Sequence, residues 1–145
     1  MRLRATAVGA GVLVLDQVSK ALVRANVEPG SRDGLLPGVD LVNTRNTGVA
    51  FSLFEDSGAV LIVFTIVAMV AVVAFFLTRP ERPGAWLPTG LLLGGAIGNL
   101  IDRVRDGGVT DFIDLPRWPA FNVADMAITA GVVVLLFVLE RRGDG

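Results

Sequence analysis

The sequence of 145 residues contains no cysteine, no histidine and no tyrosine. The lack of cysteine excludes disulfides, thiol nucleophiles and thiolate metal sites. The lack of histidine excludes Ser-His-Asp triads, imidazole bases and histidine-ligated zinc sites. Lys20 is the only lysine, so acid–base chemistry near neutral pH would fall mainly to aspartate and glutamate side chains.

Charge is also scarce. Charged residues make up 19% of the chain and hydrophobic residues 52%, with a mean hydropathy of +0.63. Soluble domains are about one quarter charged, so this composition is typical of a membrane-embedded protein. The net charge of −1 and the absence of a basic cluster predict no nucleic-acid partner. We expect no cofactor and no metal, since only oxygen ligands remain and no calcium-loop pattern occurs.

Four apolar segments are long enough to cross a bilayer as helices. They predict an all-α membrane protein with four transmembrane helices and a small extracytoplasmic β-sheet or loop segment. The first segment resembles a signal peptide, but it lacks a small-x-small cleavage site and further spans follow, so we interpret it as a retained helix. The expected organisation is a single integral membrane domain over 1–145, with helices at about 5–27, 58–77, 85–104 and 122–140 and a surface segment at 28–57.

The arginine distribution indicates how these spans are oriented. With four spans, both termini lie on one side of the membrane. The short segments on that side, which are the start of the chain, 79–84 and 140–145, each hold two arginines. This density favours cytoplasmic termini. Segments 28–57 and about 104–121 would then lie on the extracytoplasmic side.

Two further patterns concern packing. Val39–Asn43 and Val49–Phe54 have strand-like composition on either side of the turn signal Asn46-Thr47-Gly48, which predicts a small sheet on the membrane surface. The third helix carries a stripe of small residues that would let a neighbouring helix approach closely. The stripe consists of Gly90, Gly94 and Gly98.

Several polar residues fall within the expected spans, in the halves nearer the outer face. A charged side chain at that depth costs about 2.5–3.5 kcal/mol on insertion scales. Asp16 and Lys20 lie four residues apart on one helix face, and both an internal ion pair and a role facing the substrate are open. Asn99, Asp102 and Arg103 also share a face, either as a network that holds the helices together or as functional groups.

Aspartates follow the third helix and begin the fourth. Asp125 has no basic residue within four positions, so it either complements the helix dipole or does chemistry. Two carboxyls near the membrane surface meet the needs of aspartyl hydrolysis, in which one takes a proton from water and the other donates to the scissile carbonyl. Such a pair shares a proton. Residue chemistry alone leaves open which of the aspartates, Asp111 and Asp114 included, form the pair.

The alternative function is a small four-helix ion or proton-coupled carrier, with Asp16, Lys20 and Asp125 along its path. However, a conduction path is polar through the full membrane thickness, and residues 58–77 carry no charge. A purely structural scaffold gives no reason for both Asp111 and Asp125.

Five blocks along the chain carry a resemblance to a known family. They are Asp16-Gln17-Val18-Ser19-Lys20, Asn46-Thr47-Gly48-Val49-Ala50-Phe51, Gly94-Gly95-Ala96-Ile97-Gly98-Asn99-Leu100-Ile101-Asp102-Arg103, Val109-Thr110-Asp111-Phe112-Ile113-Asp114 and Phe121-Asn122-Val123-Ala124-Asp125. In this order the blocks resemble the bacterial lipoprotein signal peptidases, the signal peptidase II family of membrane aspartyl proteases.

The resemblance implies that Asp111 and Asp125 are the catalytic pair. It implies binding or supporting roles for a further set of residues, namely Asp16, Lys20, Asn46, Gly48, Asn99, Asp102, Arg103, Asn122 and Ala124. In segment 28–57, Asn46 would offer its amide to the substrate backbone and Gly48 would permit close approach.

The resemblance also implies the substrate and the location. The substrate would be a prolipoprotein that carries diacylglycerol on its lipobox cysteine, cut just before that cysteine. We expect a multi-pass monomer in the bacterial cytoplasmic (inner) membrane, in contact with membrane lipid, with its active site at the extracytoplasmic face.

Overall fold

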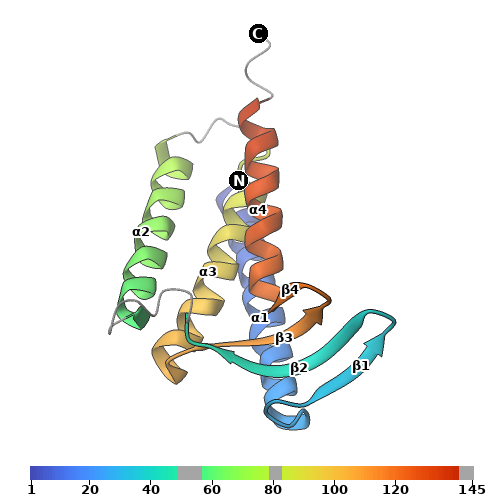
Figure 1. Cartoon of the computed structure of the whole chain (residues 1–145). Helices are drawn as coiled ribbons and strands as arrows, with labels where there is room; N and C mark the ends of the chain where they lie inside the picture. Colours follow the sequence, from blue (N-terminus) through green and yellow to red (C-terminus); the bar gives the residue numbers. More distant parts are fainter. Residues whose placement is uncertain (49–56, 79–82, 141–145) are drawn as a thin grey trace.

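The computed structural model describes residues 1–48, 57–78 and 83–140. These residues form a helical bundle with a small sheet across one end (Figure 1). The helices are α1 (Arg2–Asn26), α2 (Ser57–Thr78), α3 (Trp86–Asp106) and α4 (Val123–Glu140). The strands are β1 (Arg32–Leu36), β2 (Val39–Asn46), β3 (Val109–Leu115) and β4 (Trp118–Phe121). The prediction of a mostly helical chain with a small sheet is confirmed.

Among the described residues, three helices are long and apolar enough to cross a membrane. They are α1, the Ala59–Thr78 part of α2, and α4. Helix α3 is not among them, and it is the helix with charged residues at four of its last five positions, Asp102 to Asp106. By length and apolarity, the structure therefore supports three of the four predicted spans.

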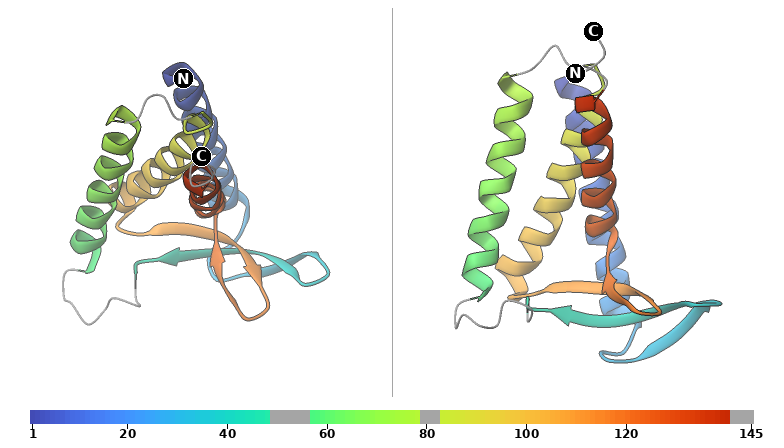
Figure 2. Two further views of the ribbon diagram at one scale, coloured as in Figure 1. Left: turned by 90° about the horizontal axis from the view of Figure 1, so that it is seen from above. Right: turned by 45° about the horizontal axis from the view of Figure 1, so that its top comes forward.

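Helix α3 is the centre of the bundle because its glycines let two helices approach it closely. A Cβ atom at Gly94 would lie 2.6 Å from the carbonyl oxygen of Gly9 on α1. On the other side of α3, a Cβ atom at Gly95 would lie 2.6 Å from the carbonyl oxygen of Ala124 on α4. The predicted close approach at the glycine stripe is confirmed, and the stripe packs within the chain. Helix α2 contacts mainly α3 and stands apart from α1 and α4 (Figure 2).

The sheet is antiparallel, in the order β1-β2-β3-β4. Strand β2 covers the predicted strand Val39–Asn43, whereas Val49–Phe54 lies outside the described residues. Strand β2 pairs with β1 and with β3, where Asn46 stands opposite Val109. Strands β3 and β4, which the sequence pattern does not predict, connect the end of α3 to the start of α4. The sheet therefore lies at the ends of three helices.

The two ends of the bundle differ in character. Helix α1 begins and α4 ends at the end away from the sheet (Figure 1). Trp86 lies at that end, where the guanidinium carbon of Arg4 is 5.9 Å from its ring centroid, and Trp118 is exposed on the sheet. Tryptophans at both ends of a bundle are typical of the two interfaces of a membrane.

The close contact between α1 and α3 predicts a stability effect. Gly94→Ala should lower the unfolding temperature in detergent, because the new Cβ forces two backbones apart, at a cost of about 1–3 kcal/mol. Gly11→Ala on α1 is the matched control, since nothing lies within 4 Å of its added Cβ. It should leave the unfolding temperature unchanged or raise it, because alanine favours helix. Equal unfolding temperatures for the two variants would contradict the packing role.

Candidate active site

The buried charged and amide side chains of the helices meet around Lys20, at the end of the bundle nearest the sheet. The Lys20 side chain is fully buried, and its Nζ lies 2.8 Å from Asp16 Oδ2 and 3.0 Å from Asp102 Oδ2. It also donates to Asn99 Oδ1 at 2.9 Å. An ammonium has three donors, so these three acceptors satisfy it completely. Of the two roles left open for Asp16 and Lys20, the structure supports the internal ion pair.

The two aspartates around Lys20 are themselves fully hydrogen-bonded. Asp16 Oδ1 accepts from the backbone N–H of Ala124 at 2.9 Å, which ties α1 to the first turn of α4. Asp102 Oδ2 accepts from the backbone N–H of Thr110 at 3.2 Å, which ties α3 to β3. Buried charges are tolerated only when paired and hydrogen-bonded in this way.

The amide of Gln17 joins the same two aspartates. Its Nε2 lies 3.2 Å from Asp16 Oδ2 and 3.1 Å from Asp102 Oδ1. Sequence reasoning did not select Gln17 or Thr110 as site residues, although both occur in the quoted blocks. A glutamine beside an in-span aspartate was the available signal, since an amide there needs partners as well.

Asn99 and Asn122 extend the network from Lys20 to two further acids. Asn99 Nδ2 donates to Asp125 Oδ1 at 2.8 Å, and Asn122 Nδ2 donates to Asp111 Oδ1 at 2.7 Å. The two amides also meet each other, with Asn122 Nδ2 3.2 Å from Asn99 Oδ1. The structure therefore brings Asp111 and Asp125 to one place, as the resemblance implied.

The local sequence explains why Asp125 faces this network. Asn122 precedes α4, and its Oδ1 accepts from the backbone N–H of Asp125 at 2.9 Å. In return, Asp125 Oδ2 accepts from the backbone N–H of Asn122 at 3.2 Å. This is a capping box, with Asn and Asp in the two roles. Asp125 therefore caps the helix and also presents Oδ1 to Asn99.

The environment of Asp111 changes its acidity. Its side chain is buried on β3, with 3% of the residue exposed. Burial, together with the nearby charge of Asp125, raises the pKa of Asp111 to about 6, against opposing hydrogen bonds from Asn46 and Asn122. Two acids at close range cannot both ionise easily. The pair can therefore hold one proton at mildly acidic to neutral pH.

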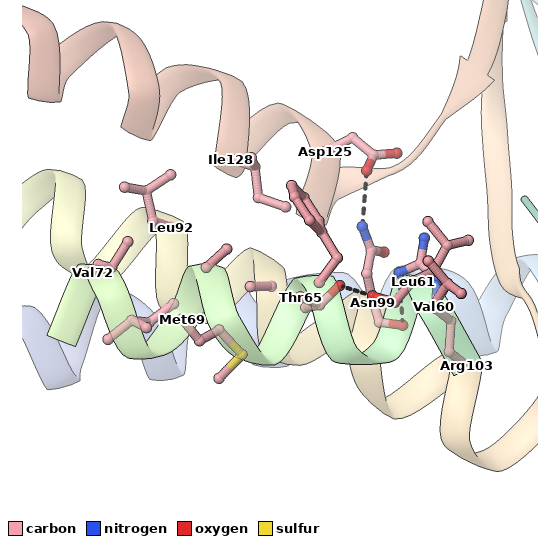
Figure 3. Close-up of a pocket in the computed structure, with 14 residues that line it drawn as sticks. Val60, Leu61, Thr65, Met69, Val72, Leu92, Asn99, Arg103, Asp125 and Ile128 are labelled. Atoms are coloured by element: carbon pink, nitrogen blue, oxygen red, sulfur yellow. Dashed lines mark hydrogen bonds between the residues drawn. The ribbon is translucent and has the colours of Figure 1, made fainter. Parts of the chain in front are cut away.

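A groove leads along the helices to Asp125. It encloses about 510 Å³ between α2, α3 and α4, and its lining is mainly apolar. Asn99, Arg103 and Asp125 are its polar residues at one end (Figure 3). Arg103 Nη1 donates to Asn99 O at 3.5 Å, and its charge acts on both Asp111 and Asp125. A long apolar group could therefore lie between the helices with its end at the acids.

Asn46 and Gly48 lie beside the site at the end of β2. Asn46 Oδ1 accepts from the backbone N–H of Gly48 at 2.9 Å, while the Asn46 side chain also hydrogen-bonds to Asp111. Gly48 has a φ of +81°, and a Cβ there would collide with Leu61 of α2. The described contacts of Asn46 are thus with the acid and the turn, and the close approach at Gly48 is to α2.

The described residues offer no group of three or more His, Cys, Asp or Glu side chains suited to hold a metal ion. The carboxyls are instead bonded to Lys20, to amides and to backbone N–H groups. The chemistry that the arrangement itself supports is proton transfer between two carboxyls, next to an apolar groove.

Long apolar helices and buried acids beside an apolar groove are features of a membrane-embedded enzyme. Comparison with known proteins agrees. The model of the family described as "Signal peptidase (SPase) II" matches residues 8–140. The "Lipoprotein signal peptidase" of Moorella thermoacetica is 43% identical over 133 residues, which cover 88% of this chain and 87% of that protein. The one of Dehalococcoides mccartyi is 41% identical over 143 residues, or 93% and 88% of the two chains.

A solved structure described as a bacterial membrane enzyme has a TM-score of 0.87, with 29% identity, and the match covers 97% of this chain and 89% of that chain. A second structure with the same description has a TM-score of 0.85 and 29% identity, covering 97% and 94%. The chain belongs to the signal peptidase II family and is a membrane protease.

The raised pKa of Asp111 predicts a dependence of stability on pH. Its pKa is about 6 in the folded chain, against an ordinary value of 3.8 for an aspartate carboxyl. The protonated carboxyl therefore contributes most to the free energy of unfolding below about pH 4. This contribution is lost as the pH rises through about 6. Asp111→Asn removes the ionisation and should be more stable than the wild type at about pH 8, by about 1–3 kcal/mol, and equally stable near pH 4.

Thermal unfolding in detergent at the two pH values measures this difference. Asp33→Asn, at an exposed position on β1, is the control. The difference between its unfolding temperature and that of the wild type should be the same at both pH values. An offset for Asp111→Asn that does not change with pH would show that Asp111 ionises as freely as a surface carboxyl.

Proposed function

We propose that this chain removes the signal peptide from diacylglyceryl-modified prolipoproteins, cutting just before the lipidated cysteine, with Asp111 and Asp125 as an aspartic catalytic pair. The observation that carries the proposal is the pair of hydrogen bonds that Asn122 donates. The Asn122 side chain donates to Asp111 Oδ1 at 2.7 Å, while the backbone N–H of the same residue donates to Asp125 Oδ2 at 3.2 Å. One residue therefore holds both carboxyls, from β3 and from α4, in a fixed relation.

The two acids would take different roles. Asp111, whose pKa is about 6, holds the shared proton and donates it to the scissile carbonyl oxygen. Asp125, which accepts a hydrogen bond on each oxygen, takes a proton from the attacking water. The water oxygen bonds to the carbonyl carbon and gives a tetrahedral diol.

Collapse of the diol completes the reaction. The carbon–nitrogen bond breaks, the leaving nitrogen receives the proton from Asp125, and one hydroxyl of the diol returns a proton to Asp111. The new carboxyl group stays on the signal peptide, and the lipidated cysteine becomes the amino terminus of the product. Both acids end in their starting states, so the pair is ready for the next substrate.

The apolar groove supports a lipid-anchored substrate. Its walls are apolar side chains of α2, α3 and α4, and its polar residues lie beside Asp125 (Figure 3). An apolar signal helix or the acyl chains of the modified cysteine would fill it and set the peptide bond at the end where the acids lie. Hydrophobic burial of about 25 cal/mol per Å² would supply the binding free energy.

The placement in the membrane follows from the same arrangement. We propose that α3 spans the bilayer together with α1, α2 and α4, that both termini are cytoplasmic, and that the sheet lies on the extracytoplasmic face of a monomer. The carrier alternative is not favoured, because the buried charged and amide side chains of the described residues cluster at the sheet end, whereas a path for ions would continue through the bundle.

The catalytic pair is tested by cleavage of a purified lipidated prolipoprotein, followed by gel shift. Asp111→Asn and Asp125→Asn should each lower the rate by about 10²–10⁴-fold, because each removes one partner in proton transfer. Asp114→Asn on the same strand as Asp111 is the matched control, since its carboxylate pairs with Arg32 at 2.7 Å. It should retain most of the activity. A well-folded Asp125→Asn variant with near-normal turnover would rule out the pair.

The groove is tested by filling it. Ala68 of α2 lines the groove, and Ala74 of the same helix lies on a different face. Ala68→Phe should raise the KM for lipidated substrate about tenfold, equivalent to about 1.4 kcal/mol of lost binding. Ala74→Phe adds the same ring elsewhere on α2 and should leave KM unchanged. Equal effects of the two substitutions would show that the substrate does not enter between α2 and α3.

A further inference from the structure

The buried ammonium of Lys20 decides which way the Asn99 amide faces. Lys20 can only donate, and it lies 2.9 Å from Asn99 Oδ1. If the amide were reversed, its NH2 group would meet the ammonium, and its oxygen would meet Asp125 Oδ1, at the 2.8 Å that now separates Nδ2 from that oxygen. Both contacts would be repulsive. Only the observed orientation gives every atom a partner of opposite kind.

The orientation of the Asn99 amide in turn sets the orientation of the Asn122 amide. With Asn99 Oδ1 turned toward Asn122, the atom of Asn122 that meets it must be a donor. Asn122 Nδ2 lies 3.2 Å from Asn99 Oδ1, 3.3 Å from Thr110 O and 2.7 Å from Asp111 Oδ1, all of them acceptors. The Asn122 oxygen in turn accepts from the backbone N–H of Asp125. The orientation of the second amide therefore follows from the first.

Lys20 is itself held in place from two sides. Asp16 and Asp102, on α1 and α3, both lie within 3.0 Å of its Nζ, and all three side chains are fully buried. The ammonium makes no described hydrogen bond or ion pair with Asp111 or Asp125, and its direct effect on them is a charge that lowers the pKa of Asp111. Its influence on hydrogen bonding at the acids passes through the amides.

We propose that Lys20 is a positioning residue that fixes the orientation of the Asn99 and Asn122 amides, so that Asp125 and Asp111 each receive an N–H donor from one of them. This inference rests on the proposed function, because it assigns a role in the same reaction. It explains why a lysine is buried beside the acids without contacting them. It also predicts that the effect of Lys20 on catalysis requires Asn99.

The first test replaces the N–H donor of Asn99 with an oxygen of an ionisable carboxyl group and keeps the shape of the side chain. In Asn99→Asp, one oxygen still accepts from Lys20, but the other meets Asp125. At about pH 8, kcat should fall about a hundredfold with KM within about threefold, a loss in the range for a proton-transfer defect. At lower pH a protonated carboxyl can donate to Asp125, so the fraction of wild-type kcat should recover at least about tenfold by about pH 5.5.

The charged groups that face position 99 are known for the described residues, and they stay the same in all variants of this test. They are Asp16 and Lys20 on α1, Asp102 and Arg103 on α3, Asp111 on β3 and Asp125 on α4. Asn99→Leu is the control of similar size, because it can never donate. Its loss of kcat should be the same at both pH values. An Asn99→Asp variant that shows no acid recovery, or that matches the wild type at pH 8, would overturn the proposal.

The second test is a double-mutant cycle that addresses Lys20 directly. Lys20→Met combined with Asp102→Asn removes one charge of each sign, so that one buried pair is deleted as a unit. This double change should lower kcat about tenfold or more in the wild type and less than about twofold in the Asn99→Leu background. Equal losses in both backgrounds would mean that Lys20 acts by another route and would overturn the proposal.

A readout independent of cleavage separates this inference from the proposed function. The side-chain amide signal of Asn99, followed by nitrogen-15 NMR in detergent, should shift as Asp111 and Asp125 titrate. The shift should disappear in Lys20→Met/Asp102→Asn. If the shift disappears as expected but the wild type cleaves no lipidated prolipoprotein, the proposed function fails and the positioning role stands. If cleavage occurs and the shift is the same in both proteins, the positioning role fails.

Discussion

The buried ion cluster around Lys20 is the interaction on which the rest of the polar structure depends. An unpaired ammonium in an apolar bundle is prohibitively costly, and Lys20 is acceptable there because three acceptors surround it. The same contacts connect α1 to α3, while Asp16 reaches Ala124 of α4. Removing one partner of such a buried pair costs about 3–5 kcal/mol, because the other charge is left alone. The same ion pairs and hydrogen bonds therefore hold the helices together and fix the geometry of the site.

The glycines of α3 make that cluster possible. A carboxylate on α1 can reach a lysine and an amide between helices only if the backbones are close, and Gly98 leaves the space that the Asp16 carboxylate occupies. Gly95 does the same on the α4 side, where the backbone of Ala124 lies against it. The small residues and the polar network therefore depend on each other, because close backbones bring the polar side chains of neighbouring helices within hydrogen-bond distance.

The sequence predicts the helices well and the sheet poorly. Uninterrupted apolar runs define helices by local composition, so α2 needed no tertiary information. The strand that carries Asp111 has no alternating pattern of polar and apolar residues, and it forms because β2, more than sixty positions earlier, supplies a partner at Thr44. Such pairing is non-local and cannot be derived from composition. The pairing of Asp111 with Asp125 came from resemblance to a family, since spacing left several aspartates equivalent.

The position of the acids also bears on the proposed reaction. Asp111 belongs to the sheet and Asp125 to the first turn of a helix, so the pair lies where the apolar groove ends and the sheet begins. A scissile peptide bond would reach both carboxyls with an adjoining apolar part of the substrate in the groove and the polar backbone beside the sheet. A substrate anchored in the bilayer by acyl chains satisfies this condition, whereas a soluble peptide would leave the groove empty and gain none of its binding free energy.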